Sequence, residues 1–303
     1  MASLTPRQWL VLVPMTLLWG INWPIMKLAV TGFPPLSFRA LSIVLGLPGL
    51  ALALKLLKVP LAVPRRHWPE LAKLALTNMV IWHVLAILAL PNLASGRAAI
   101  LAYTMPVFSA LWGLALWGDR LTTRQTVGVL LAGLAVLLLM WHELGHLGGA
   151  PWAAGAMLVA AAAWALGSQQ LRRTTSPVPT LAITFWMTAI TALVLCSLAV
   201  ALEQDRWHAP TTPVLLAVAY NAVAIFGFCQ AGLFYLSRTL PPVASSISIM
   251  VIPVEGILAA TLCFGEPLYW QDVAAMGLIV AAIAAVMLTL RKRPAAVPTL
   301  VKT

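Results

Sequence analysis

Long apolar runs separated by short polar or proline-containing links dominate the sequence. A helix that crosses the hydrocarbon core of a bilayer needs about 20 mostly apolar residues, because the core is about 30 Å thick. Runs of this length recur along the whole chain, so the pattern predicts an all-α integral membrane protein with ten transmembrane helices. The runs lie near residues 8–30, 35–57, 69–90, 93–117, 123–141, 151–171, 179–202, 212–237, 241–264 and 270–290.

Composition supports a membrane environment. Hydrophobic residues make up 61% of the chain and charged residues 9%, whereas a soluble domain carries about 25% charged residues to wet its surface. The outside of this protein must therefore face an apolar solvent, and the lipid bilayer is that solvent.

The basic residues indicate the orientation. The net charge is +11, but no nucleic-acid partner is expected, because the basic residues sit in short gaps between apolar runs and form no polar face with aromatics. If both termini lie on one side, that side holds 15 of the 19 Lys and Arg residues. The positive-inside rule then predicts that both termini are cytoplasmic, with the protein in the inner membrane.

An internal repeat is the strongest signal. Residues 101–121, LAYTMPVFSALWGLALWGDRL, are similar to residues 248–268, SIMVIPVEGILAATLCFGEPL. Both segments carry a Pro-Val pair and then a glycine–acidic pair, each separated from its counterpart by 147 residues without a gap. Trp19 and Trp164 open a second, shorter pair of similar stretches. We interpret the chain as two five-helix units, residues 1–147 and 148–303.

Each unit contains an odd number of helices, so the chain leaves the first unit on the opposite side of the membrane. The second unit therefore enters the membrane from the opposite side to the first. This predicts two inverted repeats related by an axis in the membrane plane, as in many secondary transporters. Pro106 and Pro253 occupy matched positions that we expect to be mid-helix. They are candidate hinges or cavity-lining residues, with simple helix packing as an equally good alternative.

These motifs also carry a resemblance. The run PVFSALWGLALWGDRLTTRQTVGVLLAG and its echo PVEGILAATLCFGEPL resemble the drug/metabolite transporter superfamily, specifically its EamA-type ten-helix exporters. The resemblance covers nearly the whole chain, and its overall character is similar to the aromatic amino-acid exporters of that family. It implies export from the cytoplasm through a central cavity, without ATP hydrolysis.

Ionisable residues within the spans are the first candidates for chemistry. Burying a charge at a helix centre costs roughly 2.5–3.5 kcal/mol on insertion scales, so such a group has a partner or a function. Glu255 is the carboxylate well inside an apolar run, and we expect it to carry a proton or to contact a substrate ammonium. Lys27, Arg39 and Arg97 lie nearer the outer ends of their helices, where we expect them to reach the headgroups; a substrate carboxylate is the alternative partner for Lys27 and Arg39.

Polar and aromatic residues at helical spacing complete the predicted substrate site. Residues three or four apart share one face of a helix, and several tryptophans lie too near mid-span to belong to an interfacial belt. Indoles with a few amides suit a ligand that has a flat apolar part and a polar head. The candidate substrate-binding residues are Trp19, Asn22, Trp23, Asn78, Trp82, His83, Tyr103, Trp164, Ser168 and Glu255.

One motif points to a different class of protein. Residues 142–146, HELGH, match HExxH, in which two histidines one turn apart bind zinc. We interpret the match as a coincidence in the link between the two units, since nearby glycines and Pro151 disfavour the required helix and no third ligand stands out. The three cysteines lie within apolar runs without paired spacing. No metal or cofactor is therefore expected, and an intramembrane zinc protease remains only the rival hypothesis.

Together these patterns predict a secondary transporter, not an enzyme, that exports small amphipathic metabolites by alternating access. Aromatic or neutral amino acids are the leading substrates. Cationic drugs rank second, because they favour a more acidic path, and phosphorylated metabolites rank third, because the second half offers no deep basic residues. The expected partners are a small-molecule substrate and the lipid bilayer; the oligomeric state stays open, with a monomer sufficient.

Overall fold

The computed structural model describes residues 5–145, 150–230, 232, 236 and 242–287. Within these ranges the protein contains helices and connecting segments and no β-strand. The first half holds α1 (Pro6–Gly32), α2 (Pro35–Leu56), η1 (Arg65–His67), α3 (Trp68–Ala75), η2 (Leu76–Val80), α4 (Ile81–Ala89), η3 (Leu90–Asn92), α5 (Ser95–Ala102), α6 (Met105–Trp117) and α7 (Thr123–Gly145). The second half holds α8 (Pro151–Arg173), α9 (Thr180–Glu203), η4 (Gln204–Arg206), α10 (Thr212–Tyr220), η5 (Asn221–Cys229), α12 (Pro242–Phe264) and α13 (Trp270–Met287).

These helices can cross a membrane. Among the described residues, eight helical stretches are long and apolar enough to do so, and residues 251–264 and 270–285 form two shorter apolar helices. Seven of these eight stretches agree with the predicted runs to within four residues at each end. The eighth ends at Cys229, and the rest of its predicted run, to residue 237, lies largely outside the described residues. Their outer surfaces carry exposed apolar side chains, including Leu130 at 67% and Leu193 at 68% exposure, as expected for contact with lipid.

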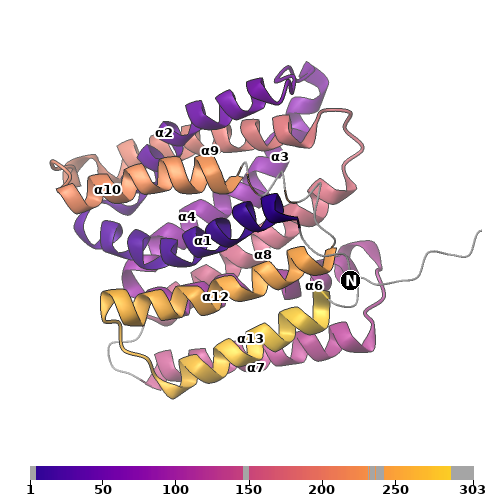
Figure 1. Ribbon diagram of the computed structural model, residues 1–303, viewed down its shortest axis with the longest axis vertical. Helices are drawn as coiled ribbons and strands as arrows, with labels where there is room; N and C mark the ends of the chain where they lie inside the picture. Colours follow the sequence, from indigo (N-terminus) through magenta and orange to yellow (C-terminus); the bar gives the residue numbers. More distant parts are fainter. Residues whose placement is uncertain (1–4, 146–149, 231, 233–235, 237–241, 288–303) are drawn as a thin grey trace, which may run out of the picture.

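The helices lie roughly side by side in one broad bundle (Figure 1). The α2–α9 pair occupies one edge and the α7–α13 pair the other. Between these edges, α1 packs along α12, and α8 packs against α4, α5 and α6. Each of the α2–α9, α7–α13 and α1–α12 pairs joins the first half to the second, so the two halves share one core.

The connecting segments gather at two opposite ends of the bundle. We call one the Arg97 end, formed by residues 33–35, 90–95, 204–211 and 265–269. The other is the His67 end, formed by residues 57–67, 118–122 and 174–179. α1 runs from the His67 end to the Arg97 end, and α2 returns.

The repeated glycine–acidic pair forms the same turn in both halves. Gly118 ends α6 and Gly265 ends α12, with φ of 67° and 65°. Only glycine adopts this left-handed conformation without strain, and it closes helix C-termini for that reason. The amide of Gly118 donates to the Leu114 carbonyl, and the amide of Gly265 donates to the Thr261 carbonyl, both at 3.2 Å. The pair is therefore repeated because each half needs this helix stop.

The matched prolines are not in equivalent positions, contrary to the prediction of two mid-helix hinges. Pro253 lies inside the continuous helix α12. Pro106 instead lies in the first turn of α6, just after the chain breaks between α5 and α6 at Tyr103 and Thr104. A proline in a first turn removes no helical hydrogen bond, so Pro106 begins a helix whereas Pro253 interrupts the hydrogen bonding of one.

Two π-helical segments occur at corresponding places of the two halves. η2 interrupts the third predicted span and η5 the eighth. Each contains an asparagine that bonds to another helix: Asn78 to α8, and Asn221 to Arg39 on α2. π-helical turns are rare and often mark functional sites, and here the asparagine of each is buried.

Candidate functional site

Three of the predicted tryptophans meet between the halves of the bundle. Trp23 on α1 lies 6.5 Å from Trp82 on α4, and Trp82 lies 5.5 Å from Trp164 on α8, measured between ring centroids. Both contacts are edge-to-face, the geometry that aromatic pairs prefer. Trp23 is buried, and the other two are partly exposed. The three rings therefore form a continuous aromatic wall that we call the tryptophan row.

Asn78 and Ser168 lie beside the tryptophan row but bond to each other. The Asn78 amide donates to the Trp164 carbonyl and to the Ser168 hydroxyl, each at 3.0 Å. Gly167 makes this approach possible, because a Cβ there would lie 2.5 Å from the Asn78 backbone nitrogen. Here Asn78 holds α8 in place, whereas the sequence predicted that both side chains contact substrate.

Trp19 lies apart from the tryptophan row. It is partly buried and packs with Met15 and Ile225 in a separate apolar cluster between α1 and η5. Tyr220 fixes the same region, since its hydroxyl donates to the Leu18 carbonyl at 2.6 Å. The structure therefore separates Trp19 from Trp23, although the two are one helical turn apart.

Glu255 occupies the contact between α12 and α1. A Cβ added to Gly20 would lie 2.5 Å from the Glu255 Cβ and 3.0 Å from its Oε2 atom. Oε2 is buried and accepts no hydrogen bond from the described residues. Tyr103, at the end of α5, is close enough for the two side chains to interact electrostatically. A buried carboxylate oxygen without a donor is costly, which makes Glu255 a candidate for protonation or for contact with a ligand.

Asn22 is a second unsatisfied group on α1. Its side chain is 6% exposed, and its Oδ1 atom has no donor among the described residues. His83 is also buried, and its ring lies 5.9 Å from Phe226 on η5. Asn22, Glu255 and the tryptophan row thus place unpaired polar atoms and aromatic faces in the middle of the bundle.

Arg39 contradicts the expectation that it reaches the headgroups. Its side chain is only 6% exposed, and it points into the bundle toward the second half. Its Nη1 atom donates to Oδ1 of Asn221 at 3.3 Å, and its Nη2 atom contacts the Met26 sulfur. The Phe226 ring lies 5.9 Å from the guanidinium carbon. Sequence reasoning missed Asn221 and Phe226, because nothing in the apolar η5 run distinguishes their direction.

Lys27 and Arg97 are also held by contacts within the protein, at the Arg97 end. The Lys27 ammonium donates to the carbonyls of Leu90 and Pro91, at 3.0 and 2.5 Å. Arg97 is 8% exposed and forms an ion pair with Asp272 on α13, with Nε 2.7 Å from Oδ1. Both were expected at the headgroups, and both instead stabilise contacts between helices.

Carboxylates of the second half also close the Arg97 end by capping helices of the first half. Glu203 accepts hydrogen bonds from the Leu36 and Ser37 amides at the start of α2, at 3.0 and 2.8 Å. Glu266 accepts one from the Ser95 amide at the start of α5, at 2.8 Å. Negative charge is favoured at helix N-termini, where backbone amides lack partners. These contacts tie the two halves together at this end.

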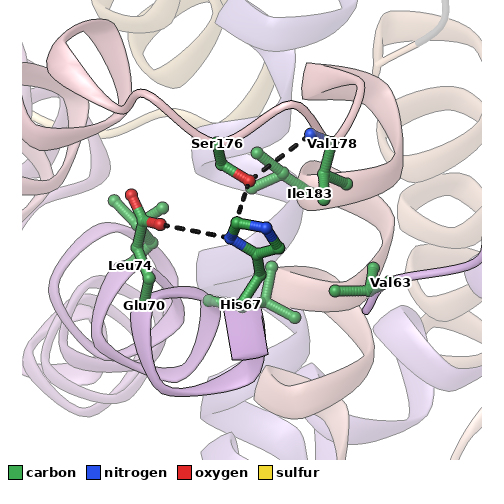
Figure 2. Close-up of a pocket in the computed structure, with 8 residues that line it drawn as sticks. Val63, His67, Glu70, Leu74, Ser176, Val178 and Ile183 are labelled. Atoms are coloured by element: carbon green, nitrogen blue, oxygen red, sulfur yellow. Dashed lines mark hydrogen bonds and ion pairs between the residues drawn. The ribbon is translucent and has the colours of Figure 1, made fainter. Parts of the chain in front are cut away.

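The His67 end is tied by different contacts (Figure 2). His67 Nδ1 lies 3.4 Å from the Ser176 hydroxyl and 4.0 Å from Glu70 Oε2. Serine, histidine and an acid also form catalytic triads, but there the two partners use opposite ring nitrogens. Here both approach Nδ1, while Nε2 accepts from Arg66. The group is a link between the first half and the α8–α9 connection, not a triad.

The HExxH segment is only partly described. α7 continues to Gly145, so the expectation that residues 142–145 form a loop is wrong; His146 and the basic residues 291–293 lie outside the described residues. Within the described part of the chain, no three His, Cys, Asp or Glu side chains gather as metal ligands.

Helices that span a membrane around a polar interior define a multi-pass membrane protein. A sequence model of the EamA-like transporter family matches residues 8–141 and again residues 151–288. The chain therefore belongs to the EamA-like transporter family, as the repeated motifs suggested. The protein is a membrane transporter and not an enzyme.

Curated relatives and a solved structure agree with this placement. The uncharacterized transporter YvbV of Bacillus subtilis is 27% identical over 91% of this chain and 90% of its own length. The uncharacterized inner membrane transporter YedA of Escherichia coli is 29% identical over 91% of this chain and 88% of its own. A solved crystal structure with 20% identity has a TM-score of 0.66 and covers 95% of this chain and 99% of its own, which shows a shared fold.

Proposed function

We propose that this transporter exports small amphipathic metabolites, foremost aromatic or neutral amino acids, from the cytoplasm by alternating access. Its ten transmembrane helices form two inverted five-helix repeats in the inner membrane, with both termini cytoplasmic. The proposal rests on the arrangement of side chains in the middle of the bundle. There the tryptophan row runs beside Glu255, whose buried Oε2 atom has no donor among the described residues.

Each part of this region suits one part of an amino acid. The Glu255 carboxylate can accept hydrogen bonds from an ammonium group, and charge-assisted bonds of this kind are stronger than neutral ones. Indole faces can stack on an aromatic or apolar side chain. Trp23 lies near both groups, because its ring belongs to the tryptophan row and also lies against Gly256, the neighbour of Glu255.

The ties at the two ends support alternating access. At the Arg97 end, the Arg97–Asp272 pair and the caps by Glu203 and Glu266 join the first half to the second. At the His67 end, the His67–Ser176 contact does the same, so relative movement of the halves must break contacts at one end. Opening the His67 end would expose the middle of the bundle to the cytoplasm in the proposed orientation, and opening the Arg97 end would expose it to the outside.

The proposal predicts a selective effect of Trp164→Ala. The substitution removes one ring of the tryptophan row but keeps the backbone carbonyl that Asn78 bonds to. Transport of phenylalanine or tryptophan by purified protein in liposomes should fall about three- to tenfold more than transport of alanine, matching about 0.5–1.5 kcal/mol for one aromatic contact. The matched control is Trp270→Ala, because Trp270 is 68% exposed on the outer surface.

Two outcomes would contradict the proposal. If Trp164→Ala and Trp270→Ala reduce the transport of all substrates by the same factor, the tryptophan row serves packing only. If wild-type liposomes take up no amino acid from a competitor panel, the substrate class is wrong, although family membership stands.

A further inference from the structure

Arg39 is a buried cation that has no counter-ion among the described residues. No carboxylate oxygen of the described residues lies within ion-pair distance of its guanidinium, and among the eight Asp and Glu residues only the side chain of Glu143 falls outside the description. Glu203 of α9 lies near the start of α2, the helix that carries Arg39. Both of its carboxylate oxygens already accept hydrogen bonds, from Leu36 and Ser37. No acid among the described side chains therefore neutralises the charge of Arg39.

Arg97 shows how this protein treats a structural guanidinium. Arg97 and Arg39 are about equally buried, at 8% and 6% exposure. Arg97 has Asp272 at 2.7 Å and the Tyr269 ring at 5.2 Å from its guanidinium carbon. A buried charge without a partner is strongly destabilising. The contrast indicates that Arg39 is kept unpaired for a partner that is not part of the chain.

The two edges of the Arg39 guanidinium are used differently. Nη1 donates to Asn221, which fixes the plane of the group. On the opposite edge, Nε has no acceptor among the described residues, and Nη2 contacts only the Met26 sulfur. A thioether is a weak acceptor, so an oxyanion can displace it. The Nε–Nη2 edge presents two parallel N–H groups, which is the geometry that binds a carboxylate with two hydrogen bonds.

Arg39 also lies in line with the proposed substrate region. Trp23 lies three residues from both Gly20 and Met26 on α1, so it neighbours each of them on the helix surface. Gly20 contacts Glu255, Trp23 belongs to the tryptophan row, and Met26 contacts Arg39. These three neighbouring residues of α1 therefore link the Glu255 region, the tryptophan row and Arg39.

We propose that the Nε–Nη2 edge of Arg39 binds the carboxylate of the transported molecule. The inference rests on the proposed function for the identity of that molecule, but the site itself requires only a small organic carboxylate. The inference narrows the proposed substrate class to molecules that carry a carboxylate, which should bind better than their amides.

The test compares an amino acid with its amide, in which a neutral carboxamide replaces the carboxylate, in liposomes containing the purified full chain. Wild type should transport tryptophan with a KM about tenfold or more below that of tryptophan amide, since a hydrogen bond to a charged group supplies this difference. Arg39→Gln should abolish the preference by raising the KM of tryptophan while leaving that of the amide nearly unchanged. Arg39→Lys should show a smaller preference, because an ammonium cannot form the paired bonds.

A second variant keeps Arg39 and supplies an internal competitor. In Asn221→Asp, a carboxylate of the same size stands 3.3 Å from Nη1, so it neutralises the cation. We expect this variant to fold and to lose the preference for the acid. Arg97→Gln is the matched control, because it disrupts a structural ion pair and should reduce transport of the acid and of the amide equally.

A binding measurement separates this inference from the substrate proposal. Benzoate should raise the unfolding temperature of detergent-solubilised wild type but not of Arg39→Gln, even if no amino acid is transported. The inference is overturned if Arg39→Gln changes the KM of acid and amide by the same factor, or if Asn221→Asp keeps the full preference for the acid. It is also overturned if chloride raises the unfolding temperature of wild type as much as benzoate does, which would indicate an inorganic anion site.

Discussion

The two glycine–acidic turns share one sequence pattern and one backbone but close opposite ends of the bundle differently. At the His67 end, Asp119 pairs with Arg173 at 2.6 Å, and these side chains are 49% and 32% exposed. At the Arg97 end, Glu266 accepts from the buried Ser95 amide, next to the Arg97–Asp272 pair, whose side chains are only 9% and 6% exposed.

This difference indicates which end opens more easily. Exposed ion pairs contribute about 0–1 kcal/mol, because water and salt screen them. Breaking a buried pair costs about 3–5 kcal/mol, because it leaves an uncompensated charge. The His67 end should therefore open more readily than the Arg97 end, and in the proposed orientation this gives a resting state that receives substrate from the cytoplasm.

The largest effect is expected for Arg97→Ala. It leaves the Asp272 carboxylate buried without its guanidinium, which should lower the free energy of unfolding by about 3–5 kcal/mol. The measurement is unfolding of the detergent-solubilised protein. If the double variant with Asp272→Ala is as unstable as Arg97→Ala alone, the cost lies in packing and the buried pair does not distinguish the two ends.

A smaller effect is expected for Glu266→Ala, which removes the acceptor of the Ser95 amide. A hydrogen bond to a charged group contributes about 1.5–3 kcal/mol, so opening of the Arg97 end should become at least about tenfold more frequent. Ala94 lines a small cavity beside Glu266, and a cysteine placed there in a background lacking Cys196, Cys229 and Cys263 reports the opening by its labelling rate.

Glu266→Gln serves as the intermediate control, because it keeps an acceptor without the charge. Labelling at position 94 that is unchanged by Glu266→Ala would contradict the assignment of Glu266 as a tie between the halves.

Much of the fold follows from hydrophobicity, and the structure confirms it. The length of each apolar run sets each span, and the glycine stops of α6 and α12 directly follow the predicted ends of two runs, at residues 117 and 264. The matched prolines show the limit of this reasoning. Pro106 begins a helix whereas Pro253 interrupts one, because the chain breaks at Tyr103 in the first half while α12 continues. A one-dimensional repeat does not reveal such a difference.

The site was only partly predictable for a similar reason. Helical spacing brought out Trp23, Trp82 and Trp164, which meet in the structure. Spacing within one helix cannot tell whether a polar side chain meets a partner on another helix. For this reason the sequence did not predict that Asn78 bonds to α8, that Lys27 bonds to the Leu90 carbonyl or that Arg97 pairs with Asp272. Arg39 is buried because η5 supplies Asn221 from the opposite half, a contact that requires the tertiary fold.

The smallest effect is expected for Asp119→Asn. The substitution removes the charge that faces Arg173, but Arg173 still bonds to Gln169 and still lies over the Trp117 ring, 4.5 Å from its centroid. The unfolding free energy should fall by at most about 1 kcal/mol. Because the pair is exposed, the difference from wild type should vanish in about 1 M salt, where the screening length is about 3 Å. The destabilisation by Arg97→Ala should persist in the same salt, since burial protects that pair. A salt-independent loss for Asp119→Asn as large as that for Arg97→Ala would mean that the two ends are closed with equal strength, and the comparison would give no preferred resting state.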